Sequence, residues 1–269
     1  MIERLPMLEL YTHPMSPCAQ KCRIVLAEKG LEWTKHFVSL PDKENLKPEY
    51  LQLNPLGVVP TLVDNGIPII ESSLICEYLE ETYPEVSLRP DNPLQRHQIR
   101  LWMKHVDNKL HPSCGALQWP LVMRDKLIAM SDEEQQTILD QVPEKPRRER
   151  QKRLLKHGLE APDVIDAVKV YQKTIADMEE ALQHSDWIVG DSFSLADIVI
   201  APYFQTLYQF GWAEMYERNC PRVTDWYARI RARESYKKGV TDDFSDEKIT
   251  ELRAKGAEGW EKVKCHMNV

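Results

Sequence analysis

The sequence lacks the long apolar run that a membrane span requires. No stretch approaches the roughly 18–20 consecutive apolar residues that a helix needs to cross a bilayer. Its first fifteen residues include acidic side chains, and they have neither the apolar block of a signal peptide nor the Arg- and Ser-rich composition of a transit peptide. We therefore expect a cytoplasmic protein without a membrane partner.

Cysteine is scarce, and basic charge is not in excess. The 6 cysteines among 269 residues are scattered without metal-ligand spacing, so we expect reduced thiols and no metal site. The 35 basic and 42 acidic residues give a net charge of −7, which argues against nucleic acid as a partner. Repeats with solenoid periods and low-complexity tracts are also absent. A chain of this length can bury a core without disulfides or metals.

The first forty residues show the pattern strand, turn, helix, strand. Residues 7–12 alternate like a short strand, and 13–17 form a break. Ser16 suits the position that caps a helix, and Pro17 suits its first turn. The helix that follows is expected to end at Gly30, and residues 33–40 read as a second strand.

The next forty residues predict two strands and a helix. After a short helical piece at 47–51, residues 54–63 run from a turn into a strand, and Asn65-Gly66 is a strong hairpin signal. Residues 67–70 would form the returning strand of the hairpin, and Glu71-Ser72 would begin a helix. Residues 7–83 thus predict a βαβ unit followed by a ββα unit.

Beyond a turn-rich linker at 89–93, the sequence shows only helical patterns. Helices are expected at about 94–117, 161–184, 195–213 and 221–233, with Pro162, Pro202 and Pro221 near the starts of the last three. Between the first two lies a polar stretch, 119–160, where Ser131 to Glu134 form a capping box. We predict an α/β domain at 1–85 and an all-helical domain at 93–269.

Ser16 is the candidate for chemistry. A helix start presents unpaired N–H groups and a partial positive charge, so it stabilises an anion, and a hydroxyl there can donate a hydrogen bond to a thiolate. The thiolate is the nucleophilic form of a thiol. A serine in this position is more often only a cap.

Two further features are weak alone. Val59 precedes Pro60, and a cis proline there would leave the Val59 N–H and C=O able to pair with an extended peptide. At Glu71-Ser72, a carboxylate, a hydroxyl and backbone N–H groups could hold an amino-acid head group, although such residues are usually caps.

Taken together, these features resemble the N-terminal domain of the cytosolic glutathione transferases. SPCAQKCRIVLAEKGLEW is similar to the start of the serine-type enzymes, and LNPLGVVPTLVDNGIPIIESSLICEYLEE resembles the family signature N-P-x-G-x-V-P-x-L … E-S-x-x-I-x-x-Y-L. The resemblance implies a thioredoxin-like α/β domain, an all-α second domain, glutathione as co-substrate and a homodimer. It also implies that Ser16 activates the thiol, Val59 pairs with the cysteinyl backbone and Pro60 is cis. Glu71 and Ser72 would then bind the γ-glutamyl end, and Lys43 or Lys47 the glycine carboxylate.

The second half carries the same resemblance. DSFSLAD is similar to the family element in which a Ser/Asp capping box starts a buried helix. The stretch from Ser131 to Gly158 resembles the insertion of bacterial glutathione-dependent β-aryl etherases. Its basic run, Arg147 to Lys156, reads as a solvated face or as a guide for anionic glutathione.

Several readings remain open. One or two aromatic side chains are expected to face a small apolar electrophile, although aromatics at helical spacing are usually core: Trp102, Trp119, Tyr203, Tyr208 and Trp212. Cys18 could be reactive, but we expect it to pack inward and Cys22 to be core.

The chain is expected to be an enzyme that uses a glutathione thiolate. The alternative is a non-catalytic adaptor that binds a protein, which would not need Ser16, Pro60, Glu71 and Ser72 together.

Overall fold

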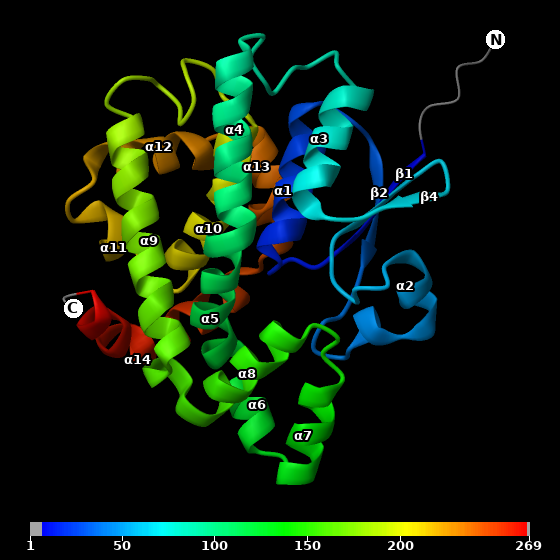
Figure 1. Ribbon diagram of the computed structural model, residues 1–269, viewed down its shortest axis with the longest axis vertical. Coiled ribbons are helices and arrows are strands. Elements are labelled where there is room, and N and C mark those ends of the chain that lie inside the picture. The colour runs from blue at the N-terminus through cyan, green and yellow to red at the C-terminus, as the bar shows by residue number, and fades with distance from the viewer. Residues whose placement is uncertain (1–6, 268–269) are drawn as a thin grey trace. The chain divides into compact units, whose positions relative to one another are not determined.

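The computed structural model (Figure 1) describes residues 7–267. These residues divide into two compact units. Unit 1 contains the described residues up to Met103, together with Asp191–Pro202 and Ala228–Phe244. Unit 2 contains Lys104–Gly190, Tyr203–Tyr227 and the described residues from Ser245 onward. The predicted domain ranges 1–85 and 93–269 follow chain order and stay a prediction, and residues 1–6 and 268–269 lie outside the described part of the chain.

A four-stranded mixed sheet organises unit 1, with the strand order β2-β1-β3-β4. β1 pairs in parallel with β2 and antiparallel with β3, which pairs antiparallel with β4. The strands are β1 (Leu8–Thr12), β2 (Trp33–Phe37), β3 (Thr61–Asp64) and β4 (Ile67–Ile69). This arrangement confirms the predicted βαβ–ββα order and the thioredoxin-like fold class.

Helices α1 (Pro17–Glu28) and α3 (Ser72–Thr82) lie side by side against the sheet (Figure 1). Gly30 has a φ of +65°, the left-handed conformation expected just after a helix end. Asn65 and Gly66 both have positive φ, as a two-residue hairpin turn requires. The short helical piece is larger than predicted, because a 3-10 turn (Glu44–Leu46) precedes α2 (Pro48–Leu53).

Every element after residue 90 is helical within the described chain, which confirms the predicted all-α half. The capping boxes are present as expected: the Ser131 hydroxyl accepts from the Glu134 N–H, and the Ser194 N–H donates to Asp197 at 3.0 Å. The helices are α4 (Pro93–His105), α5 (His111–Val122), α6 (Arg124–Ile128), α7 (Asp132–Asp140), α8 (Lys145–His157), α9 (Pro162–Ala181), α10 (Leu195–Gln209), α11 (Glu214–Glu217), α12 (Pro221–Arg231), α13 (Glu234–Gly239) and α14 (Asp246–His266).

The first of the predicted helices is not continuous. A π-helical turn, Val106–Leu110, separates α4 from α5, and Pro112 stands in the first turn of α5. Proline has no N–H to donate to the preceding turn, so a regular α-helical ladder cannot run through this point. Pro202 was also misplaced, because it lies inside α10 and not near its start.

The sequence analysis assigned no particular helix after residue 233, so it missed α13 and the long helix α14. α14 carries Gly256 and Gly259, which lower helix propensity. Packing explains Gly256: a Cβ there would meet the Phe210 carbonyl oxygen at 1.9 Å. Gly256 therefore lets α14 approach the end of α10, and its own carbonyl accepts from the Trp212 indole at 2.9 Å.

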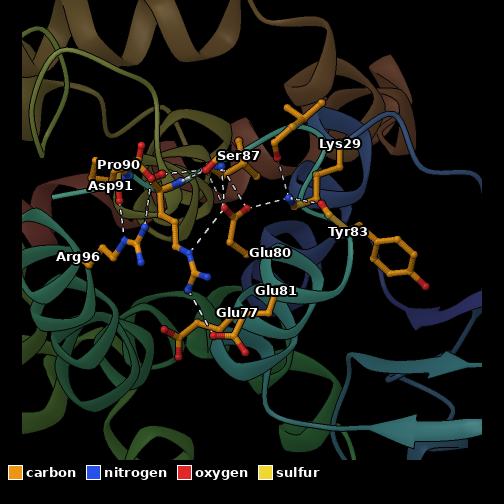
Figure 2. Close-up of polar contacts among 12 residues, drawn as sticks. Lys29, Glu77, Glu80, Glu81, Tyr83, Ser87, Pro90, Asp91 and Arg96 are labelled. Carbon is orange, nitrogen blue, oxygen red and sulfur yellow. Dashed lines mark hydrogen bonds and ion pairs between the residues drawn. The ribbon is translucent and has the colours of Figure 1, made fainter. Parts of the chain in front are cut away.

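A buried ion pair fixes the chain where α3 ends (Figure 2). Lys29 Nζ lies 2.7 Å from Glu80 Oε2, and both side chains are almost fully buried. Lys29 also donates to the carbonyls of Tyr83 and Val86, at 2.9 and 2.7 Å. The Glu80 carboxylate accepts from the Leu88 N–H at 3.1 Å. One ion pair thus satisfies the backbone of the turn that leaves α3.

We expect Glu80→Gln to lower the free energy of unfolding by about 3–5 kcal/mol, because it leaves the Lys29 ammonium buried without its counter-charge. Urea unfolding followed by tryptophan fluorescence measures this loss. Glu81→Gln is the matched control, since Glu81 pairs with Arg89 on the surface and such pairs contribute about 0–1 kcal/mol. Equal losses of unfolding free energy in the two variants would show that the buried Lys29–Glu80 pair contributes no more than a surface pair.

Candidate functional site

Ser16 lies at the junction of β1 and α1, where the chain makes a tight turn. Its N–H donates to the His13 carbonyl at 3.1 Å, and its Oγ accepts from the Ala19 N–H at 3.3 Å. Ser16 is therefore a helix cap, as the simpler reading expected. The cap uses the oxygen as an acceptor, so the hydroxyl proton can still be donated to another group. The side chain is half-buried, which leaves part of it accessible.

A buried arginine, which the sequence analysis missed, holds this turn. Arg23 has no exposed surface. Its guanidinium donates to the Thr12 hydroxyl and to the carbonyls of His13 and Pro14, the latter two at 3.3 and 3.4 Å. Gln20 adds a second bond to the Pro14 carbonyl at 2.7 Å. The backbone before Ser16 is thus fixed by two side chains from α1.

The other side of Arg23 faces the segment that follows α12. Its Nε donates to the Gly239 carbonyl at 2.6 Å and lies 3.4 Å from Asp243 Oδ2. Burial lowers the pKa of Arg23 to about 10, and the Asp243 carboxylate opposes that shift. A Cβ at Gly239 would meet the Ile24 backbone nitrogen at 2.9 Å, so α13 lies directly on α1. Arg23 joins the Ser16 turn to residues more than 200 positions later.

The Val59–Pro60 peptide bond is cis, as predicted. Within residues 7–267, nothing hydrogen-bonds to the Val59 N–H or C=O, although Val59 is buried. An extended peptide that pairs with Val59 would supply the missing partners. The structure thus leaves free the two backbone groups that the sequence analysis assigned to binding.

Side chains not predicted from the sequence hold the loop before Pro60. The Tyr50 hydroxyl donates to the Val58 carbonyl at 2.6 Å and lies 2.9 Å from Thr61 Oγ1, and Asn54 donates to the same carbonyl at 2.9 Å. Burial raises the pKa of Tyr50 to about 12, so it stays protonated and keeps donating. Asparagines that cap loops are common in turns, so the sequence pattern gave no specific signal for Asn54.

Glu71 adopts a conformation that is rare for residues other than glycine. Its φ is +70°, its side chain is exposed, and it makes no capping bond to α3. Its neighbour Ser72 is buried at the first position of α3, where its Oγ accepts from Lys21 Nζ at 3.3 Å. A strained backbone that is not used for capping is typical of functional positions. The simple reading of Glu71 as a side-chain cap is therefore wrong.

The two lysine candidates flank the Glu44–Leu46 turn. Lys43 precedes it with a φ of +55°, and Lys47 follows it with an exposed ammonium 3.4 Å from Glu44. Glu44 accepts from the Ser39 N–H at 2.8 Å, and this bond, followed by Lys47, lowers the pKa of Glu44. Lys47 thus already has an acidic partner.

The aromatic candidates fall into different environments. Tyr203 and Trp212 have no exposed surface and belong to the core of unit 2. Trp119 and Tyr208, also in unit 2, are half-buried, and so is Trp102 in unit 1. The last three therefore keep surface that a small apolar molecule can contact.

The cysteines near Ser16 differ in exposure. Cys18 is half-buried. Cys22 is fully buried as predicted, and its thiol donates to the Ser72 carbonyl at 3.5 Å. Burial, followed by the contact with Cys76, raises the pKa of Cys22. A thiol with a raised pKa is a poor nucleophile, so Cys22 is structural.

No cluster of three or more His, Cys, Asp or Glu residues between positions 7 and 267 is arranged to hold a metal ion. None of the helices in this range combines the length and apolar composition of a membrane span.

Comparisons with known proteins agree with this geometry. Residues 15–82 match the glutathione S-transferase N-terminal domain model, and residues 119–234 match the C-terminal domain model. The chain is 31% identical over 235 residues to the protein LigF of Sphingobium, covering 86% of this chain and 91% of that protein. The crystal structure of that β-etherase superposes with a TM-score of 0.77 at 30% identity, covering 87% of this chain and 98% of the other.

Two further relatives cover similar shares. Glutathione S-transferase D7 of Drosophila melanogaster is 28% identical over 248 residues, covering 88% of this chain and 95% of that protein. A stringent starvation protein A homolog of Coxiella burnetii is 25% identical over 239 residues, covering 89% and 94%.

We expect Arg23→Lys to destabilise the protein by about 2–4 kcal/mol. Lysine has no planar fork, so it cannot reach Thr12, His13 and Gly239 together and leaves buried acceptors unpaired. Thermal or urea unfolding measures the loss. Arg222→Lys, near the surface at the start of α12, is the control and should change stability by less than about 1 kcal/mol. Similar values for the two variants would show that Arg23 does not hold the turn.

Proposed function

Because the chain belongs to the glutathione S-transferase family, we propose that it binds glutathione in unit 1 and uses the glutathione thiolate to attack an apolar electrophile. The observation that carries the proposal is the combination of a half-buried Ser16 at the start of α1 with unpaired backbone groups on Val59. The first provides a donor for a sulfur anion, and the second provides a partner for the cysteinyl backbone of the tripeptide. Glu71 and Ser72 would hold the γ-glutamyl end, and Lys43 or Lys47 the glycine carboxylate.

The serine hydroxyl and the helix start act on the thiol in the same direction. A hydrogen bond to a charged group contributes roughly 1.5–3 kcal/mol, and the end of a helix adds about 0.3–1 kcal/mol. At about 1.36 kcal/mol per pKa unit, the two lower a thiol pKa of ~8.5 by about 1.3–3 units. The pKa of the bound thiol then falls to about 5.5–7.2, so a large fraction is ionised at neutral pH without a general base.

The electrophile is proposed by chemical class. Attack by the thiolate forms a C–S bond as the bond to the leaving group breaks. With a β-aryl ether the leaving group is an aryloxide, which takes a proton from solvent. Similarity to the β-etherase LigF favours this reaction over halide displacement or epoxide opening.

A non-catalytic adaptor is the second candidate function, and the observation that favours it is a relative named for stringent starvation, not for transfer. Retention on immobilised glutathione separates the two, because an adaptor that has lost the chemistry has no need to bind the tripeptide. A screen of glutathione-dependent activity on β-aryl ethers, halides, epoxides and organic peroxides then identifies the substrate class. The cytoplasmic location expected from the sequence is part of this proposal.

We expect Ser16→Ala to lower turnover by roughly 10- to 1000-fold, because one donor to the thiolate is lost. Glutathione affinity should be largely preserved, and the pKa of the bound thiol should rise, so activity appears at higher pH than in wild type. Thiolate absorbance near 240 nm and steady-state rates measure the two effects.

Cys18→Ala, two residues further on, is the matched control and should keep wild-type turnover. An unchanged rate and an unchanged thiol pKa in Ser16→Ala would reduce Ser16 to a helix cap.

A homodimer is part of the proposal, and the exposed apolar side chains of α3 and α4 support it. Leu74, Leu94 and Leu101 are 59%, 65% and 53% exposed. Leu94 and Leu101 are seven residues apart and so lie on one side of α4, while Arg100 pairs with Glu77 of α3 at 2.8 Å. A two-fold partner is the commonest way to cover such a face.

We expect Leu101→Glu to convert the dimer into a monomer, since it places a charge in an apolar interface. Sedimentation velocity measures the change. Ile128→Glu, at an exposed apolar position on α6, is the control and should leave the dimer intact. A wild-type protein that sediments as a monomer would contradict the proposal.

A further inference from the structure

Lys21 is a lysine without exposed surface in the middle of α1. Its Nζ lies 3.3 Å from Ser72 Oγ and 3.4 Å from Ser73 Oγ, both in the first turn of α3. A buried amino group has to find hydrogen-bond acceptors, because burial without them is costly. The sequence analysis singled out Ser72 and gave no role to Lys21.

The direction of the bond from Lys21 determines what Ser72 can offer a ligand. A lysine ammonium donates hydrogen bonds and accepts none, so Ser72 Oγ acts as the acceptor. The hydroxyl proton of Ser72 is then available to a second partner, which has to be an acceptor. Cys22 donates to the Ser72 carbonyl at 3.5 Å, so two adjacent residues of α1 hold this serine in place.

The surroundings of Ser72 favour a carboxylate as that acceptor. The start of α3 presents unpaired N–H groups and a partial positive charge, to which the Lys21 ammonium adds. Beside it, the exposed carboxylate of Glu71 is not used as a cap. A hydroxyl and a cation next to a free carboxylate match an amino-acid head group, which carries one charge of each sign.

We propose that Lys21 is a positioning residue that acts through Ser72 to set the affinity for the α-carboxylate of the γ-glutamyl residue of glutathione. The inference rests on the proposed function and deepens it at this subsite. Lys21 does not touch the ligand: it orients the Ser72 hydroxyl and places a positive charge behind it.

Two ligands and three variants test the proposal in the full-length chain. The ligands are glutathione and 4-aminobutanoyl-cysteinyl-glycine, which lacks only the α-carboxylate, and calorimetry gives their dissociation constants. We expect Lys21→Met to weaken glutathione binding about 10- to 100-fold, because the Ser72 hydroxyl loses both the donor that orients it and the positive charge behind it. Binding of the analogue should weaken by less than about twofold. Lys21→Arg should retain most of the preference for glutathione. Lys238→Met, at an exposed position of α13, should behave as wild type.

A residue that only packs α1 against α3 would change both ligands equally. Equal losses in Lys21→Met, or no loss, would overturn the inference. If thermal melts show that Lys21→Met does not fold, Ser72→Ala takes its place and must show the same selective loss. Wild-type protein that binds neither ligand would refute the proposed function itself, whereas wild-type binding with equal losses refutes this inference alone.

Discussion

The structure of unit 1 depends on three buried basic side chains, two in α1 and one on Lys29, the residue that follows it. Lys21, Arg23 and Lys29 are all buried, and each binds a different part of the fold. Lys21 reaches the start of α3, Arg23 the turn before Ser16, and Lys29 the chain that leaves α3. Burying a lysine or arginine is costly unless its donors are satisfied, so each of these segments is held in one position. Both helix starts proposed to contact glutathione are fixed from the same helix.

This arrangement allows Ser16 to be both a helix cap and the catalytic group that we propose. The cap uses the serine oxygen as an acceptor, while catalysis would use its proton. Ser72 repeats the pattern, with Lys21 in place of a backbone N–H. In both cases the protein supplies a donor to the serine oxygen and leaves the hydroxyl proton available to an acceptor. The two hydroxyls therefore suit the two anionic groups that our proposal assigns to them, the cysteinyl thiolate and the α-carboxylate of the γ-glutamyl residue.

The sequence predicted local features well and distant packing poorly. The confirmed features depend only on neighbouring residues. They are the alternation of the first strand, the helix cap at Ser16, the helix end at Gly30 and the hairpin turn at Asn65-Gly66. In the sequence, Arg23 and Lys21 look like ordinary polar residues of an amphipathic helix. Their hydrogen-bond acceptors lie 216 and 51 positions away, respectively, so the neighbouring residues give no sign of them. α14 was missed for a related reason: Gly256 weakens a helix locally, and only the close contact with Phe210 explains it.

The contact between Arg23 and Gly239 has a consequence for the order in which the protein is made. The ribosome completes the sheet, α1 and α3 long before it reaches residues 234–243, so a nascent chain of about a hundred residues contains Ser16 without the carbonyl and carboxylate that Arg23 requires. During this interval the Arg23 guanidinium, which is buried in the folded protein, has to remain hydrated. The packing around Arg23 in unit 1 is therefore completed only near the end of translation.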